Sequence, residues 1–279
     1  MSDLHDPRPV GVFDSGLGGL TAVREILRLL PAESIVYFGD TAHLPYGNKS
    51  RESVTRFSLE IARFLIDQDV KCLLVACATA SSNALDTLTQ RLEVPVIGVI
   101  EPAARAAVAA SPRGRIGVIG TLGTVGSGAY PRAVEALAPG ARVISHACPL
   151  FVPLVEEGWI DHPVTRRVAE EYLADLKSGD LESLILGCTH SPLIAPLLRE
   201  LLGPGVALID SGAEAARAMG ALLAERGQLA AGEPEHRFYL SDRPLHFTRV
   251  ARAFLGRDLP PTFLIDLNDP HAAVPTAVR

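Results

Sequence analysis

The feature that most constrains the fold is a regular alternation of short apolar runs with longer amphipathic stretches. Apolar residues recur at helical spacing over 20–30 and 53–66, which predicts a helix in each place. Continuous apolar runs bounded by Gly or Pro lie between such stretches, as expected of buried strands, at 9–14, 34–40, 71–76 and 95–100. This alternation predicts an α/β fold in which a mostly parallel sheet is covered on both faces.

The second half of the chain repeats the pattern of the first. Residues 11–18 are echoed by residues 117–124, and residues 73–79, which contain a cysteine, are echoed by residues 184–190. The repeat predicts two similar, pseudo-symmetric lobes, each a mostly parallel sheet flanked by helices, with the active site in the cleft between them. We expect the following boundaries: lobe one over 1–98, joined by 210–255, which returns to it; lobe two over 99–209; and a Pro-rich tail over 256–279.

Composition excludes several classes of protein. With 26 Lys and Arg against 32 Asp and Glu, the net charge of −6 argues against a nucleic-acid partner. No apolar run approaches the ~20 residues that cross a bilayer, and the polar start at 1–6 does not read as a leader, so we expect a cytoplasmic protein with no membrane partner. Four cysteines are too few for a disulfide scaffold in a chain of this size, so we expect reduced thiols.

Two nucleotide-binding motifs fail in this sequence. The turn at 16–21 lacks the third glycine of a dinucleotide fingerprint, and residues 47–50 lack the Gly-Lys pair of a phosphate-binding loop. Only Lys49, Lys71 and Lys177 could form a pyridoxal Schiff base, and none has clear partners at a strand end. We therefore expect no cofactor.

Two cysteines stand at matching positions of the repeat. Cys77 and Cys188 each follow a buried strand and precede a helix, the place where parallel sheets bind ligands and where a helix N-terminus favours a thiolate. One such cysteine would be read as structural, but two predict sulfurs that flank one cleft. Inversion of a stereocentre needs a base on one face and an acid on the other, so the two titrations would be coupled.

Eight segments carry a resemblance to a known family: 13–21, 37–42, 45–50, 76–81, 98–102, 120–124, 147–158 and 186–190. They occur in the family's order and span residues 10 to 216. On these segments the chain resembles the glutamate racemases, within the cofactor-independent aspartate/glutamate racemases. The resemblance implies interconversion of L- and D-glutamate without cofactor or metal, a supply of D-glutamate for peptidoglycan, and a homodimer.

The resemblance also implies roles for individual residues. Cys77 and Cys188 would be the acid/base pair on the faces that handle the D- and L-enantiomers respectively. Asp14 would assist Cys77, whereas Glu156 and His190 would assist Cys188. The substrate would be held by the following residues: Ser15, Pro45, Tyr46, Gly47, Ala78, Thr79, Thr121, Thr124 and Thr189.

Two positions depart from the family pattern. The asparagine that usually follows the first cysteine is Ala78, and the aromatic residue that usually follows Cys-Thr-His is Ser191. Loss of one hydrogen bond to a charged ligand, worth ~1.5–3 kcal/mol, would weaken binding by about ten- to a hundred-fold. We therefore expect reduced or altered activity with both thiols chemically competent.

From the residues alone, other interpretations of these positions stay open. Asp14 could cap the following helix, and His190 could be a core histidine. Glu156 could pair with a surface arginine, and the residues do not rank it above Glu157. Tyr46 could be a turn aromatic.

Other functions also stay open. His146, Cys148, Cys188 and His190 could together bind zinc, although their spacing is not that of common zinc ribbons. Otherwise we interpret Cys72 and Cys148 as buried structural thiols. The chain could instead be a non-catalytic amino-acid-binding protein, or a racemase of aspartate or a hydantoin.

Overall fold

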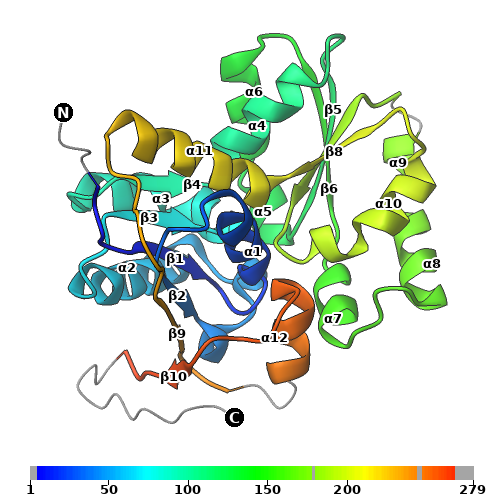
Figure 1. Cartoon of the computed structure of the whole chain (residues 1–279). Helices are drawn as coiled ribbons and strands as arrows, with labels where there is room; N and C mark the ends of the chain where they lie inside the picture. The colour runs from blue at the N-terminus through cyan, green and yellow to red at the C-terminus, as the bar shows by residue number, and fades with distance from the viewer. Residues whose placement is uncertain (1–4, 178–179, 244–246, 268–279) are drawn as a thin grey trace.

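The computed structural model describes residues 5–177, 180–243 and 247–267, and its strands form two separate parallel sheets (Figure 1). The first sheet contains, in spatial order, β10 (Thr262–Leu264), β9 (His236–Leu240), β2 (Ile35–Gly39), β1 (Val10–Asp14), β3 (Cys72–Val75) and β4 (Val96–Gly98). The second contains β6 (Arg142–Ala147), β5 (Arg115–Gly120), β7 (Ser183–Gly187) and β8 (Ala207–Asp210). Every neighbouring pair is parallel, as the apolar strands predict.

The strand order confirms the internal repeat. Lobe one has the order β2-β1-β3-β4 and lobe two has the matching order β6-β5-β7-β8. The two halves of the chain therefore build two separate sheets with the same strand order. The chain then returns to lobe one, where β9 pairs with β2. Strand β10 lies inside the range expected to be a Pro-rich tail, but Thr262 and Ile265 are buried against lobe one. Residues 268–279 of that range lie outside the described residues.

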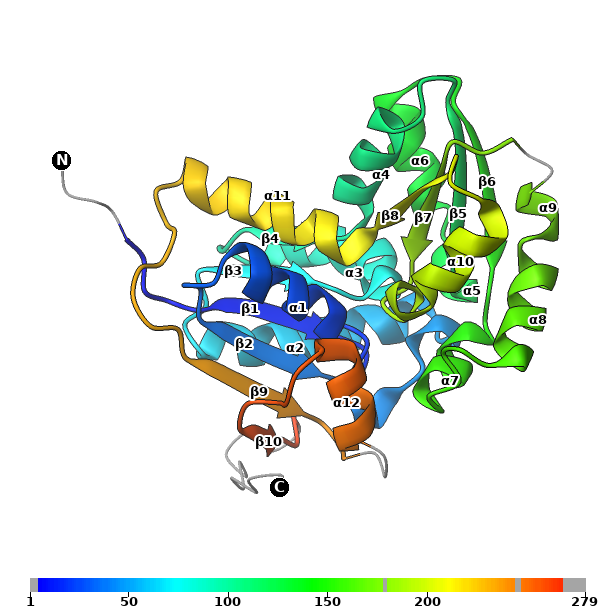
Figure 2. The ribbon, with the colours of Figure 1, turned by 45° about the vertical axis from the view of Figure 1, so that its right-hand side comes forward.

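The first sheet is covered by helices on both faces (Figure 2), and alternate side chains of β1 belong to the cores on its two sides. Val10 and Val12 belong to the core beneath the first group of helices, and Phe13 belongs to the core beneath the second. The first group comprises α1 (Leu20–Leu29), α11 (Ser211–Glu225) and α12 (Phe247–Leu255). The second comprises α2 (Arg51–Asp67) and α3 (Ala78–Arg91), and the short helices η1 (Thr41–His43) and η2 (Tyr46–Asn48) precede it.

The second sheet is surrounded by shorter helices. These are α4 (Ile100–Ala109), α5 (Leu122–Gly126), α6 (Ala129–Leu137), α7 (Phe151–Glu156), α8 (Pro163–Tyr172), α9 (Ala174–Lys177), η3 (Ser191–Ile194) and α10 (Ala195–Leu202). Helix α11 contacts α1 of lobe one and α4 of lobe two, so it joins the two lobes (Figure 2). None of the helices in the described ranges is long and apolar enough to span a bilayer.

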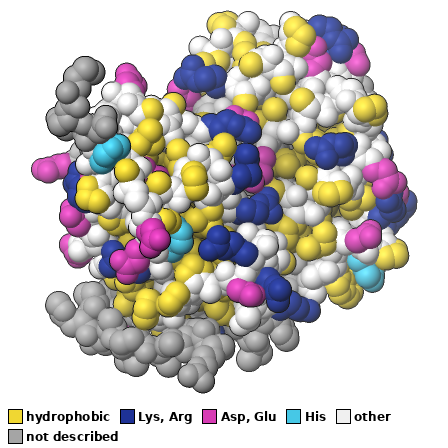
Figure 3. Space-filling model, in the orientation of Figure 1, with side chains coloured by type: hydrophobic (Ala, Val, Ile, Leu, Met, Phe, Trp, Pro, Cys, Tyr) yellow, Lys and Arg dark blue, Asp and Glu magenta, His cyan; other side chains and the backbone are white. Residues whose placement is uncertain are grey.

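Charged side chains of both signs are spread over both lobes on the face shown in Figure 3. This mixed pattern agrees with the nearly balanced composition of 26 basic and 32 acidic residues.

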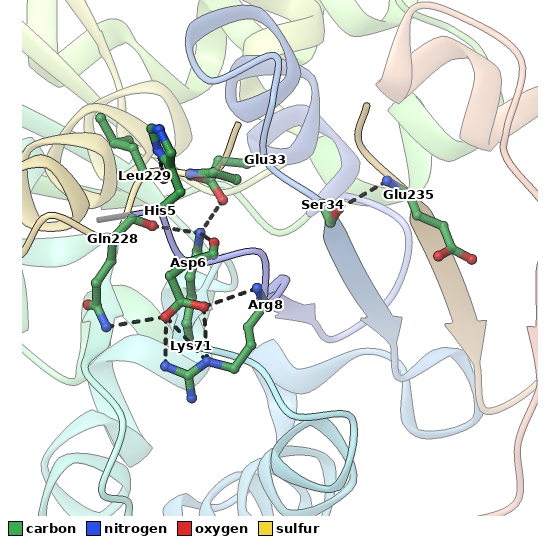
Figure 4. A network of polar contacts seen from close by, with 10 residues as sticks. His5, Asp6, Arg8, Glu33, Ser34, Lys71, Gln228, Leu229 and Glu235 are labelled. Carbon is green, nitrogen blue, oxygen red and sulfur yellow. Dashed lines mark hydrogen bonds and ion pairs between the residues drawn. The ribbon is translucent and has the colours of Figure 1, made fainter. Parts of the chain in front are cut away.

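A buried ion pair fastens the start of lobe one to the chain that returns to it (Figure 4). Lys71 Nζ lies 2.7 Å from Glu33 Oε2, and both side chains are almost fully buried. The ammonium also donates to the carbonyl oxygens of Asp6 and Gln228, each at 2.8 Å. Glu33 Oε1 accepts from the backbone N–H of Ala230 at 2.8 Å. The pair therefore links four segments that are distant in sequence.

We expect Lys71→Met to lower the free energy of unfolding by about 3–5 kcal/mol, because it leaves the Glu33 charge buried without its partner. Urea unfolding measures the loss. The double variant Lys71→Met/Glu33→Gln should recover part of it, since the second change removes the unpaired charge. Arg166→Met, which breaks an exposed pair with Glu200, is the control and should change little. An equal loss in both single variants would contradict the role of burial.

Candidate active site

A small cavity lies where the carboxyl ends of the two sheets face each other. Its volume is about 30 Å³, which at ~10–15 Å³ per water holds about two water molecules. Lobe one and lobe two both line it, with these residues: Ser15, Leu44, Pro45, Tyr46, Gly47, Cys77, Ala78, Thr79, Thr121, Val152, Gly187, Cys188, Thr189 and His190. The lobes are thus closed on each other, and they must move apart before an amino acid can enter.

Cys77 occupies the lobe-one wall. It follows β3 and is the N-cap residue of α3, where its sulfur accepts from the backbone N–H of Ala80 at 3.4 Å. The thiol lies 3.6 Å from Ser15 Oγ, and the residue is 6% exposed. Burial, followed by the nearby carboxylate of Asp14, raises the pKa of the Cys77 thiol to about 12. Cys77 is therefore protonated in the closed, empty site at neutral pH.

Asp14 stands directly behind this wall, at the end of β1. Its Oδ2 accepts from the backbone N–H of Gly16 at 3.0 Å, but α1 is capped by Gly19 without a side-chain bond. The N-cap position of α1 is thus occupied by Gly19 and not by Asp14. Gly19 is needed for another reason, because a Cβ there would lie 2.4 Å from Asp14 Cβ. Burial raises the pKa of Asp14, against an opposing effect of the His190 charge.

A hydrogen-bonded chain supports the second thiol. Cys188 follows β7, and its sulfur lies 3.7 Å from Nδ1 of His190. The other ring nitrogen, Nε2, lies 2.9 Å from Glu156 Oε1 at the end of α7. Glu156 is thus the glutamate that faces the site, rather than a partner of a surface arginine, and His190 is a buried residue of the cavity wall.

The protonation of His190 follows from these contacts. Burial lowers the pKa of His190, but hydrogen bonds to Cys188 and Glu156 outweigh that effect and raise the pKa to about 10. The imidazole therefore carries a proton at neutral pH. Cys77 thus lies near a carboxylate, whereas Cys188 lies beside a protonated imidazole.

Three threonine hydroxyls join the lobes at the edge of the cavity. Thr79 Oγ1 of lobe one lies 2.9 Å from Thr121 Oγ1 and 3.1 Å from Thr124 Oγ1 of lobe two. The two lobe-two hydroxyls are 3.1 Å apart, which completes a triangle. A second contact between the lobes runs from Thr21 Oγ1 to the carbonyl oxygen of Thr189 at 3.1 Å. Of the triangle, Thr79 and Thr121 line the cavity, and Thr124 stands behind them.

The structure brings all of the expected substrate-binding residues except Thr124 to the cavity. Of the expected catalytic residues, Cys77, Cys188 and His190 line the cavity, whereas Asp14 and Glu156 lie behind its wall. Sequence reasoning missed the following lining residues: Leu44, Val152 and Gly187. Val152 and Gly187 lie within segments that carry the family resemblance, and Leu44 directly precedes Pro45, so their positions offered a signal.

The proposed zinc ligands do not form a metal site. Among the described residues, no group of three or more His, Cys, Asp or Glu side chains is arranged to hold a metal ion. Cys148 is buried, and its sulfur contacts the carbonyl oxygen of His146 at 3.7 Å. None of the lysines lines the cavity, and Lys71 is engaged in the ion pair described above.

Two parallel α/β lobes that present one thiol each to a shared cavity define a class of enzyme able to act on both faces of a small molecule. The chain belongs to the Asp/Glu/Hydantoin racemase family, whose pattern matches residues 10–219. It is an enzyme of the isomerase class, as the sequence resemblance implied.

Individual relatives cover nearly the whole chain. The glutamate racemase of Geobacter metallireducens is 48% identical over 263 residues, which are 93% of this chain and 97% of that protein. Glutamate racemase isoform RacE1 of Bacillus anthracis has a TM-score of 0.91 and 40% identity, covering 94% of this chain and 99% of its own. The Francisella tularensis glutamate racemase, solved in complex with D-glutamate, has a TM-score of 0.89 and 39% identity, covering 95% and 99%.

The raised pKa of His190 makes stability depend on pH with a definite sign. The folded value of about 10 exceeds the unfolded value of ~6.5, so the stabilisation is complete below ~6.5 and is lost as pH rises through about 10. We expect the difference in unfolding free energy between wild type and His190→Gln to shrink over this window, by at most about 1.4 kcal/mol per pH unit. Urea unfolding from pH 6 to 10.5 measures it. A difference independent of pH would show that His190 is neutral.

Proposed function

We propose that this chain interconverts L-glutamate and D-glutamate by a two-thiol acid/base mechanism without a cofactor. The observation that carries the proposal is the placement of Cys77 and Cys188 on the walls of one cavity, each from a different lobe. The names of the relatives support glutamate as the substrate. Aspartate and hydantoins, which the family description also names, are the alternatives to be compared in the same assay.

In the forward direction, Cys188 acts as the base on L-glutamate. Its thiolate takes the α-proton, and the electron pair of the broken C–H bond is left on the α-carbon and delocalised into its carboxylate. Cys77, a thiol in the closed site, then gives its proton to the opposite face of the same carbon. The product is D-glutamate, and one proton has moved from Cys77 to the substrate while another has moved from the substrate to Cys188.

After this turnover Cys77 is a thiolate, although burial and the nearby carboxylate of Asp14 raise its pKa and favour its thiol form. Cys77 must therefore regain a proton before the next molecule of L-glutamate is converted.

Substrate binding relies on neutral donors. None of the residues that line the cavity is an arginine or a lysine, so the two carboxylates must be held by hydroxyl and backbone N–H groups. Hydrogen bonds to a charged ligand contribute ~1.5–3 kcal/mol each, and the threonines of both lobes together with Ser15 supply several. Because the donors come from both lobes, binding favours closure of the cleft.

The wider role is part of the same proposal. A cytoplasmic enzyme of this kind would supply D-glutamate for peptidoglycan, and the homodimer implied by the family resemblance would be its assembled form. Light scattering of the purified chain tests the dimer. Rescue of a bacterial strain that requires added D-glutamate tests the cellular role.

We expect Cys77→Ser and Cys188→Ser each to lower kcat for racemisation by about 10²- to 10⁴-fold, the usual contribution of a positioned general acid or base. Circular dichroism of both glutamate enantiomers measures racemisation. In D₂O, exchange of the α-proton of L-glutamate should survive better in Cys77→Ser, and that of D-glutamate in Cys188→Ser, because each variant keeps one base.

Cys72→Ala is the control for these variants, since Cys72 is buried in β3 away from the cavity. It should retain racemisation. If either catalytic variant keeps wild-type activity, the two-thiol mechanism is wrong. If the wild-type chain binds glutamate but exchanges no α-proton, it is a binding protein and not a racemase. If it racemises aspartate or a hydantoin faster than glutamate, the proposal of glutamate as the substrate is wrong.

Ala78 lines the cavity and is 5% exposed. We expect Ala78→Asn to raise kcat/KM for glutamate by about ten- to a hundred-fold, because the amide restores one hydrogen bond to a charged substrate group. Steady-state kinetics in both directions measures the change. The control is Ala78→Leu, which adds bulk without a hydrogen-bond donor and should not raise kcat/KM. Ala80→Asn is not a suitable control, because Ala80 is fully buried.

Unchanged kcat/KM in Ala78→Asn would mean that the missing amide is no handicap. The threonines and Ser15 would then provide all the binding that this chain needs.

A further inference from the structure

Asp40 is a buried carboxylate that takes no part in the steps above and does not line the cavity. It follows β2 directly and is fully buried. Its Oδ2 accepts from the hydroxyl of Tyr46 at 2.5 Å, and its Oδ1 accepts from Ser241 Oγ at 2.8 Å. His43 Nδ1 lies 2.9 Å from Oδ1. Several polar side chains thus converge on one carboxylate.

One of these bonds reaches the loop that forms part of the cavity wall. Tyr46 is 1% exposed and begins η2, and its neighbours Pro45 and Gly47 line the cavity with it. Its hydroxyl points to Asp40 and is therefore committed away from the substrate. Asp40 thus holds the side chain of Tyr46 in place, and Tyr46 belongs to the loop that forms this part of the cavity wall.

The loop has little freedom in its position. A Cβ placed on Gly47 would lie 2.7 Å from Cβ of Thr121 in lobe two, so the loop meets the other lobe at backbone distance. A Cβ on Gly123 would in turn lie 3.0 Å from the carbonyl oxygen of Gly47. A shift of this loop would displace the donors of residues 45–47 and disturb the contact through which the lobes close.

The start of the same loop is held to the end of β9. Thr41 Oγ1 donates to the carbonyl oxygen of Asp242 at 2.5 Å and accepts from its backbone N–H at 2.9 Å. The imidazole of His43 stacks on Phe57 with ring centroids 4.1 Å apart. These contacts hold residues 41–43. The part that lines the cavity is held by the bond between Asp40 and Tyr46 and by packing of the Tyr46 ring against Phe57, with centroids 5.8 Å apart.

We propose that Asp40 is a positioning residue for substrate binding, which holds the wall loop of residues 44–47 in its binding-competent place through the hydroxyl of Tyr46. The proposal rests on the proposed racemase function for its kinetic readout. If the loop is in its binding-competent place for only a fraction of the time, the apparent dissociation constant of the substrate equals the intrinsic constant divided by that fraction. The saturated enzyme has an ordered loop, so proton transfer is unaffected.

The test is a double-mutant cycle of Asp40→Asn and Tyr46→Phe in the full chain. Each variant weakens or removes the same bond, so KM for both glutamate enantiomers should rise by about ten-fold, as expected for a competent fraction of about one tenth. The kcat should change by less than about two-fold. The double variant should resemble the single variants, because the bond can be lost only once.

Asp210→Asn is the matched control. Asp210 follows β8, the last strand of lobe two, and accepts from the backbone N–H groups of Gly212 and Ala213 at 2.9 and 3.1 Å. It caps α11 and does not line the cavity. Asp210→Asn should lower Tm as Asp40→Asn does, but it should leave KM unchanged. A rise of KM in the control, a loss of kcat in Asp40→Asn, or additive effects in the cycle would overturn the proposal.

A second measurement does not depend on racemisation. Hydrogen exchange of the ligand-free protein should be faster over residues 44–48 in Asp40→Asn than in wild type, and unchanged there in Asp210→Asn. Equal exchange in all three proteins would refute the positioning role of Asp40. If the wild-type chain fails to racemise glutamate, the proposed function fails while hydrogen exchange still decides on Asp40.

Discussion

Parallel pairing is the constraint on which this structure depends. Strands that run in one direction end at one edge of their sheet, and here the ends of two such sheets face a common cavity. Asp14 and Cys77 end adjacent strands of lobe one, and Thr121 and Cys188 end adjacent strands of lobe two. Residues far apart in the sequence are brought together by the fold, with no need for a long loop to carry them.

The lobes are similar in topology, yet the two thiols differ in chemistry. Cys77 is buried beside a carboxylate, which favours the protonated sulfur. Cys188 is beside an imidazole whose hydrogen bonds to Cys188 and Glu156 raise its pKa to about 10. The same strand order in the two lobes thus places one thiol on each side of the cavity, but the residues behind the two thiols differ in charge.

Sequence reasoning reached the parallel sheets and the repeat because both depend on local patterns. The apolar strands are visible as runs in the chain, and the two cysteines follow such runs directly. The family resemblance was needed to choose Glu156 over Glu157. The two residues are adjacent, and only the direction of α7 relative to His190 distinguishes them.

Other features could not be predicted because their partners are distant in sequence. The ring of His43 contacts Asp40 and stacks on Phe57, and the sequence around His43 gives no sign of either contact. Lys71 is an isolated lysine in the chain, and nothing local indicates that Glu33 and two carbonyl groups surround it. Strand β10 carries a weak pattern because it is short and lies among prolines, and its pairing with β9 depends on tertiary contacts.

The closed cavity links substrate affinity to the contacts between the lobes. With room for about two water molecules, the closed state holds no amino acid, and its threonine hydroxyls satisfy one another. Under the proposed function, a carboxylate of glutamate would replace these bonds between hydroxyls. The affinity would then be the difference between two bridged states, one joined by Thr79 and Thr121 directly and one joined through a carboxylate. Because hydrogen bonds to a charged group are the stronger kind, this exchange would favour the substrate even without an arginine in the wall.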